Sequence, residues 1–255
     1  MKSSLTVIIP ALNEEPHIAN TVNETIDALQ DTIVDYEITI FNDGSTDRTG
    51  EISDRLAQDN PRIEVIHHES PRGLGYVYKA GVRRASKEYV LMVPGDNEVH
   101  RDSVHNVLKE VGETDIVITY HANPEIRSRS RQIISKMFAG VIRYGSSINI
   151  RYFNGLVVHR TDVVRRALSE ISNGFAYQAE ILVRLIQLGL DYKEVGLTIL
   201  PRPKTNAFRF SNLINTIGNT FKLVCRLKFK ENTFSLPETP IVATGTAQPV
   251  TTWKM

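Results

Sequence analysis

Four polar clusters in the first hundred residues carry side chains that could do chemistry. They are Asn-Glu-Glu at 13–15, Asn-Asp-Gly-Ser-Thr-Asp at 42–47, Ser-Pro-Arg-Gly-Leu-Gly at 70–75 and Gly-Asp-Asn-Glu at 95–98. Carboxylates can hold a hard divalent cation, arginine can bind a phosphate or carboxylate, and glycine lets the backbone approach a ligand closely. Taken singly, such clusters are also typical of turns, because Asp-Gly is a common turn pair. Their placement in the fold must therefore decide whether they form a functional site or only turns.

The strands predicted before these clusters indicate that the four clusters lie close together. Short apolar, β-branched runs at 5–10, 36–41, 62–67 and 89–93 predict strands, and helical patterns follow them. Ser45 or Asp47 can cap the second helix. Repeated strand–helix units indicate an α/β fold with a mostly parallel sheet, in which ligands bind beyond the carboxyl ends of the strands. All four clusters fall at those ends.

The second half of the chain predicts a different arrangement. Helical patterns at about 126–144 and 175–188 flank the segment 148–160, and a strand is predicted at 192–200. An amphipathic helix is predicted at 211–230, with Leu213, Ile217, Phe221, Val224 and Leu227 on one face. With its basic residues, this helix could lie in a membrane interface or pack on the core. Residues 231–255 predict a loosely ordered tail.

Composition limits the class of protein. The chain of 255 residues has 30 Lys and Arg against 29 Asp and Glu, which disfavours nucleic acid as the main partner. Cys225 is the single cysteine, so an intramolecular disulfide is excluded and a reducing, cytoplasmic compartment is expected. The sequence contains neither a signal-peptide pattern nor an apolar run of the ~20 residues needed to span a bilayer. We expect a cytoplasmic protein and, if it associates with a membrane, a peripheral association with the cytoplasmic face.

The motifs VIIPALNEE at 7–15 and FNDGSTDRT at 41–49 resemble the family 2 glycosyltransferases. With PRGLG at 71–75, the order is similar to polyprenyl-phosphate hexose synthases related to dolichyl-phosphate mannose synthase. The resemblance extends over residues 5–100 and more weakly to about 212. It implies a single Rossmann-like nucleotide-diphosphosugar transferase domain over 1–210. The nucleotide-binding half would be about 1–120 and the acceptor half about 121–210.

The resemblance also implies roles in donor binding. The residues that it places around the base, ribose and diphosphate are Pro10, Ala11, Asn13, Glu14, Asp43, Gly44, Arg72, Gly73 and Gly75. Relatives carry Asp-x-Asp after the fourth strand, where a divalent cation, Mg²⁺ or Mn²⁺, is held against the diphosphate. Here Pro94 occupies the first acidic position and Asp96 the second, and Glu98 could supply a further oxygen. Asp96 and Glu98 are therefore the predicted metal ligands.

Four further residues match positions that assist catalysis in the family. Arg131 precedes an Ile-Ser pair, and Arg202 with Lys204 belongs to the loop that closes over the diphosphate. The usual Gly-x-Ser-Lys after that loop is replaced by Thr-Asn-Ala-Phe at 205–208. Glu180 could be a general base for a hydroxyl acceptor, orient the donor sugar, bind a cation, or simply be a solvent-facing helix carboxylate.

The resemblance implies an inverting transfer of a hexose from a GDP-mannose or UDP-glucose type of donor to a polyprenyl or dolichyl phosphate. A phosphate acceptor is ionised near neutral pH and needs no base, whereas a sugar hydroxyl needs one. Two alternatives remain open. One is a soluble transferase that glycosylates a saccharide or small-molecule hydroxyl. The other, suggested by Pro94, is a catalytically impaired nucleotide-sugar-binding protein.

Overall fold

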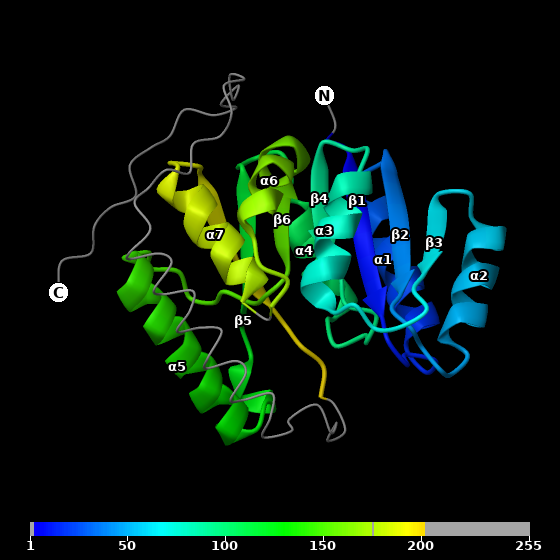
Figure 1. Cartoon of the computed structure of the whole chain (residues 1–255), viewed down its shortest axis with the longest axis horizontal. Helices are drawn as coiled ribbons and strands as arrows, with labels where there is room; N and C mark the ends of the chain where they lie inside the picture. The colour runs from blue at the N-terminus through cyan, green and yellow to red at the C-terminus, as the bar shows by residue number, and fades with distance from the viewer. Residues whose placement is uncertain (1–2, 175, 202–255) are drawn as a thin grey trace.

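The structure is a computed structural model that describes residues 3–174 and 176–201 (Figure 1). The predicted amphipathic helix at 211–230 and the tail at 231–255 lie outside the described residues. In the part of the chain that is described, no helix combines the length and apolar character needed to cross a membrane.

A seven-stranded sheet with the order β3-β2-β1-β4-β6-β5-β7 forms the centre of the molecule (Figure 1). Its strands are β1 (Leu5–Ala11), β2 (Tyr36–Asn42), β3 (Ile63–His67), β4 (Tyr89–Met92), β5 (Ile116–His121), β6 (Val157–Arg160) and β7 (Tyr192–Leu197). All pairings are parallel except those of β6, which runs antiparallel to both β4 and β5. The predicted α/β class with a mostly parallel sheet is confirmed.

Helices cover both faces of this sheet. They are α1 (Ile18–Gln30), α2 (Thr49–Asp59), α3 (Leu74–Arg84), α4 (Arg101–Leu108), α5 (Arg129–Ser146), α6 (Thr161–Ala167) and α7 (Tyr177–Gln187), with the 3₁₀ turns η1 (Pro124–Ile126) and η2 (Leu168–Glu170). One core lies under α1, α2 and α4, and the other lies under α3, α6, α7 and the inner side of α5.

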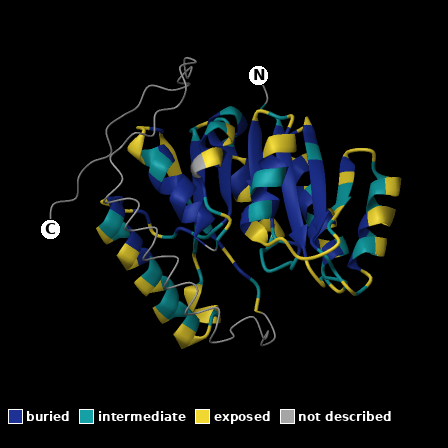
Figure 2. Ribbon diagram, viewed as in Figure 1, coloured by how far each residue is buried: buried dark blue, intermediate teal, exposed yellow. Residues whose placement is uncertain are grey.

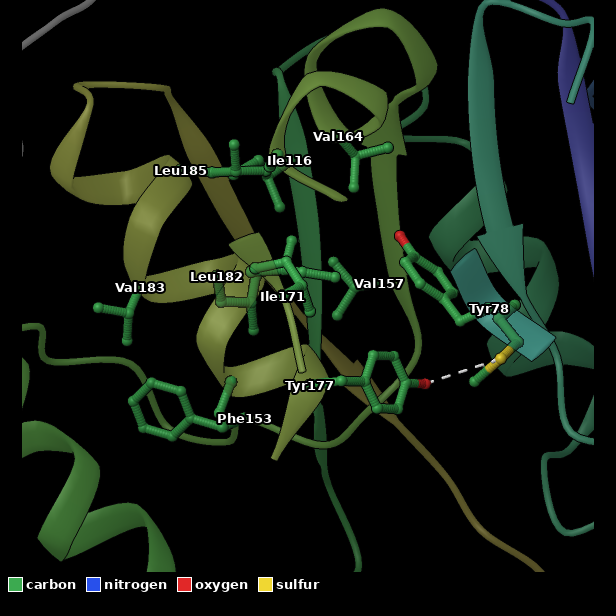
Figure 3. Close-up of a cluster of buried hydrophobic side chains, with 14 of the residues drawn as sticks. Tyr78, Ile116, Phe153, Val157, Val164, Ile171, Tyr177, Leu182, Val183 and Leu185 are labelled. Carbon is green, nitrogen blue, oxygen red and sulfur yellow. Dashed lines mark hydrogen bonds between the residues drawn. The ribbon is translucent and has the colours of Figure 1, made fainter. Parts of the chain in front are cut away.

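Alternation along β1 explains how one strand serves both cores. All seven of its residues are buried. Val7 and Ile9 face the core under α1, while Ile8 faces the core under α3. Because both faces are covered, the strand is a continuous apolar run, as expected of a central parallel strand. Figure 3 shows the second core, where Tyr78, Phe153, Tyr177 and Leu182 are brought together from distant parts of the chain.

Two local features differ from the sequence-based expectation. Arg48, and neither Ser45 nor Asp47, occupies the N-cap position of α2, although Asp47 Oδ1 accepts a hydrogen bond from the Thr49 amide at 3.0 Å. The segment 148–160 also contains the antiparallel strand β6, which inserts between β4 and β5. This insertion brings the loop before β6 next to the carboxyl end of β4.

Candidate active site

Hydrogen bonds join the loops after β1 and β2 at the carboxyl edge of the sheet. Asn13 has a positive φ of 56°, and its amide donates to Ser45 Oγ at 3.0 Å. Its side-chain oxygen accepts from the Thr46 amide at 2.8 Å, and the Glu14 amide donates to Thr49 Oγ1 at 2.8 Å. Asn13 and Glu14 therefore fix the geometry of this edge. Their predicted contact with the base and ribose, like that of Pro10 and Ala11, stays a prediction.

Asp43 organises the glycine-rich loop between β3 and α3. Its buried carboxylate accepts from His68 Nδ1 at 2.7 Å and from the amides of Arg72 and Gly73, each at 2.9 Å. Burial by itself raises the pKa of Asp43, but these hydrogen bonds outweigh it and hold the pKa below its ordinary value. Glycine at position 44 lets this loop pack closely against the turn after β2, because a Cβ there would lie 2.7 Å from Pro71 N.

A cavity of about 370 Å³ opens beside this loop. It lies between the N-terminus of α3, the carboxyl ends of β4 and β5, and the loops that precede β6 and α7. Its walls combine glycines, two carboxylates, one arginine and one histidine with apolar side chains. Its lining residues are Gly73, Leu74, Gly75, Met92, Pro94, Asp96, Glu98, Val99, His121, Arg127, Asn154, Gly155, Leu156, Asn173, Gly174, Tyr177, Gln178, Leu197 and Ile199.

Gly73 and Gly75 shape the α3 side of the cavity in different ways. Gly73 is the N-cap of α3 with φ +87°, and a Cβ there would meet nothing within 4 Å. A Cβ on Gly75 would lie 2.6 Å from the Asn173 carbonyl oxygen. Gly75 therefore allows the loop before α7 to pack against α3, whereas Gly73 leaves open space at the start of the helix.

Asp96 and Glu98 form the acidic side of the cavity. Asp96 Oδ1 accepts from the Glu98 amide at 3.1 Å. Glu98 Oε1 pairs with Arg127 Nη2 at 3.1 Å, and Arg127 Nη1 donates to the Tyr152 hydroxyl at 3.2 Å. Among the described residues, no group of three His, Cys, Asp or Glu side chains could hold a metal ion. A cation at Asp96 and Glu98 would therefore need oxygen ligands from a substrate and water.

His121, at the end of β5, places a neutral polar ring in the cavity wall. In the described part of the chain, neither ring nitrogen has a hydrogen-bond partner, and both are buried. Burial and the neighbouring Arg127 lower the pKa of His121 to about 4. The ring packs on Tyr152 with 4.6 Å between the ring centroids. At neutral pH His121 is thus an uncharged hydrogen-bonding group.

Glu180 is buried on α7, so the interpretation as a solvent-facing carboxylate is wrong. Its side chain is 1% exposed. Glu180 Oε2 accepts from the Ser172 amide at 3.1 Å, and Oε1 pairs with Arg184 at 3.4 Å. The carboxylate supports the loop that contributes Asn173 to the cavity and is not itself a lining residue. These contacts favour a positioning role, and the catalytic role remains a prediction.

The other predicted residues divide into three groups. Gly73, Gly75, Asp96 and Glu98 line the cavity. Those outside its lining are Pro10, Ala11, Asn13, Glu14, Asp43, Gly44, Arg72 and Arg131. Arg202 and Lys204 lie outside the described residues. Among the described residues, the arginine that lines the cavity is Arg127, which precedes α5.

Sequence reasoning missed Arg127, His121, Tyr177 and Gln178 as lining residues. Tyr177 also connects the cavity wall to the core, since its hydroxyl donates to Met92 Sδ at 3.7 Å (Figure 3). The helical spacing around Tyr177 indicated only a buried face. No local pattern distinguished Arg127 from the other basic residues near α5, because the ion pair with Glu98 joins residues 29 positions apart.

Sequence comparison finds similarity to known glycosyltransferases. The chain is 26% identical over 205 residues to an undecaprenyl-phosphate mannosyltransferase of Micrococcus luteus, a match covering 76% of this chain and 83% of that protein. It is 29% identical over 125 residues to the glycosyltransferase GlyG of Streptococcus pneumoniae, covering 48% of this chain but only 40% of GlyG. It covers 32% of the uncharacterized glycosyltransferase EpsJ of Bacillus subtilis at 34% identity over 115 residues.

Solved structures show the same fold at low sequence identity. Glucosyl-3-phosphoglycerate synthase from Mycobacterium tuberculosis, in complex with phosphoglyceric acid, superimposes with a TM-score of 0.65 and 19% identity. That match covers 89% of this chain and 80% of the synthase. The family model for glycosyl transferase family 2 matches residues 6–168, which is more than half of the chain. The chain therefore belongs to glycosyl transferase family 2.

Proposed function

We propose that this glycosyltransferase moves a hexose from a nucleoside-diphosphate sugar to a polyprenyl phosphate. The observation that carries the proposal is the chemistry of the cavity wall. Among the described residues, it has glycines at the N-terminus of α3, the carboxylates Asp96 and Glu98, and a histidine, His121, whose pKa is lowered to about 4. The Micrococcus luteus relative supports the choice of acceptor, because its name specifies a polyprenyl phosphate and the match covers most of both chains.

The donor diphosphate would lie at the N-terminus of α3. The first amides of a helix have no intrahelical partner and carry partial positive charge, which favours phosphate. Asp43 holds the preceding loop through the amides of Arg72 and Gly73, so it presents the first turn of α3 in a fixed geometry. The open space at Gly73 lets a phosphate come close to the backbone.

Asp96 and Glu98 would hold the divalent cation. Mg²⁺ is commonly bound by one or two protein carboxylates together with substrate phosphates and water, so two carboxylates at the cavity edge fit it. A cation there supplies positive charge to the departing diphosphate. Two complexes of the Mycobacterium tuberculosis synthase contain Mg²⁺ or Mn²⁺ together with uridine diphosphate, which supports this assignment. The ion pair with Arg127 orients Glu98 and partly neutralises its negative charge.

A phosphate acceptor fits the groups that face it. A phosphate oxygen would form the new bond to the anomeric carbon as the bond to the diphosphate breaks, and the electron pair would leave on the diphosphate oxygen. This step needs no proton transfer from the acceptor. His121, with a pKa of about 4, is a poor base at neutral pH, and Glu180 lies behind the cavity wall. Both observations favour a phosphate over a hydroxyl.

The test is a transfer assay with defined donors and acceptors. GDP-mannose and UDP-glucose are incubated with Mg²⁺ or Mn²⁺ and either undecaprenyl phosphate in detergent or 3-phosphoglycerate, and products are identified by mass spectrometry. We expect a hexosyl-phosphoryl-polyprenol, with a loss of at least about 100-fold in Asp96→Asn, consistent with removal of a group that stabilises the leaving charge. Asp102→Asn, at an exposed position on α4, is the matched control.

Three results would contradict the proposal. Product formed only with 3-phosphoglycerate or another soluble acceptor would favour the soluble transferase. Binding of GDP or UDP in a thermal-shift assay, without transfer or donor hydrolysis in any combination, would favour the impaired nucleotide-sugar-binding protein that Pro94 suggests. A Glu180→Gln variant that abolishes turnover but leaves donor binding intact would point to a hydroxyl acceptor.

A further inference from the structure

The outward side of α5 exposes a row of large apolar side chains. Ile133, Met137 and Val141 are 57%, 64% and 44% exposed. They are spaced four residues apart and therefore lie on one side of the helix. Ala139 and Ile142 are buried on the opposite side, so α5 is apolar towards both the core and its surroundings. Figure 2 shows exposed residues recurring along this helix.

The charge on α5 has a single sign. The helix contains Arg129, Arg131, Lys136 and Arg143 and has no acidic residue in its sequence. Two of these arginines lie in the first turn, where the positive end of the helix dipole makes basic residues unfavourable. Arg143 is engaged with the carbonyl oxygens of Ile150 and Arg151, whereas Arg129 and Lys136 are exposed. A surface carrying negative charge would offset both the dipole and the arginines.

We propose that the α5 face, defined by Ile133, Met137 and Val141 with Arg129 and Lys136, docks on an anionic lipid bilayer. An apolar row flanked by basic residues matches the chemistry of a helix that lies in the interface of anionic membranes. The apolar side chains enter the boundary between headgroups and acyl chains, and the basic residues contact lipid phosphates.

This docking rests on the proposed function, because its role would be to bring a lipid-phosphate acceptor to the cavity. Arg127 lines the cavity and immediately precedes the first turn of α5, and Gln132 Nε2 donates to the Arg127 carbonyl oxygen at 2.8 Å. A bilayer on the α5 face would therefore lie close to the Arg127 side of the cavity. A lipid phosphate could then reach the cavity while its hydrocarbon chain remains in the membrane.

The experiment is co-sedimentation of the full-length chain with vesicles, which requires no substrate. Binding should increase when phosphatidylglycerol is added to phosphatidylcholine vesicles and should decrease as salt is raised. Met137→Asp should weaken binding about tenfold or more, because it removes an apolar contact and adds a charge that anionic lipid repels. Lys136→Gln should weaken binding about fivefold, as expected for one basic charge near an anionic surface.

Val34→Asp is the matched control, since Val34 is 55% exposed and lies between α1 and β2. It should leave vesicle binding unchanged. Circular dichroism and thermal unfolding check that each variant is folded, and Lys136→Gln tests the proposal if Met137→Asp is unstable.

Three outcomes would overturn the proposal. Equal binding by wild type, Met137→Asp and Lys136→Gln would show that α5 is not the docking surface. Loss of binding only in Phe221→Asp would assign membrane contact to residues 211–230. A dimer in light scattering that Met137→Asp dissociates, without vesicle binding, would make the α5 face an interface between copies. Failure of the proposed function is distinguishable, because transfer would be absent in detergent while wild type still binds vesicles.

Discussion

Replacing Asp43 by asparagine tests whether one buried carboxylate holds the loop that presents α3. Asp43 Oδ1 accepts from His68 and the Arg72 amide, and Oδ2 accepts from the Gly73 amide. In Asp43→Asn, the rotamer that keeps Oδ1 in place preserves two bonds and turns an NH₂ group towards the Gly73 amide. The carboxylate charge is lost from all three bonds.

The cost follows from these contacts. Losing one charge-assisted hydrogen bond costs about 1.5–3 kcal/mol, and the amide that faces the new NH₂ is left without an acceptor. We therefore expect Asp43→Asn to lower the free energy of unfolding by about 2–4 kcal/mol, measured by urea denaturation at pH 7. We also expect a higher KM for the donor, because the loop carrying Gly73 would no longer be fixed.

The pH dependence gives a second signature. The pKa of Asp43 is lowered in the folded state, so its stabilising contribution is present above the unfolded pKa of about 3.9 and is lost as pH falls through the folded pKa. The difference in unfolding free energy between wild type and Asp43→Asn should be constant above about pH 5 and shrink below about pH 4.

Asp54→Asn provides the control, because Asp54 also bonds a histidine, His67, but its side chain is 51% exposed. We expect this variant to lose less than about 1 kcal/mol. If Asp43→Asn is no more destabilising than Asp54→Asn, the reasoning that Asp43 holds the loop is refuted. The same holds if the donor KM is unchanged.

Three further predictions follow from other contacts. Gly75→Ala should destabilise the protein by about 1–3 kcal/mol, because its Cβ would lie 2.6 Å from the Asn173 carbonyl oxygen. Gly140→Ala, whose Cβ would have nothing within 4 Å, should stabilise it by about 0.5–1 kcal/mol. Thermal unfolding should therefore show a lower Tm for the first variant and a higher Tm for the second. Burial lowers the pKa of His121 to about 4, below the unfolded value of about 6.5, so the unfolded chain binds the extra proton between these values and stability should rise with pH there. His121→Phe should reduce this slope by about 1 kcal/mol per pH unit in urea unfolding at pH 4.5–6.5, and equal slopes for the two proteins would contradict this. Arg127→Gln should cost about 1–3 kcal/mol by leaving Glu98 without its cation. Arg48→Gln, at a side chain that is 60% exposed, should leave the denaturation midpoint unchanged, and equal midpoints for the two variants would argue against the pair.

Local sequence patterns determined the first half of the fold. The strands β1, β2 and β4 are recognisable because a parallel strand covered on both faces must be apolar at nearly every position. Gly73, Gly75 and Asp96 were predicted as site residues because their motifs resemble those of the family and follow predicted strands, whose carboxyl ends meet at one edge of a parallel sheet. The motifs also identified the family, which the comparisons confirmed.

Only the tertiary structure decided which residues of the second half join that site. The antiparallel insertion of β6 carries the loop with Asn154 to the carboxyl edge, and pairing of β5 beside β6 brings His121 there. The buried carboxylate of Glu180 accepts a hydrogen bond from the Ser172 amide, and the ion pair with Arg127 orients Glu98. Except for the Ser172–Glu180 bond, these effects arise from contacts between segments distant in sequence. Helical or strand spacing indicates which side of an element is apolar, but not which neighbour will cover it.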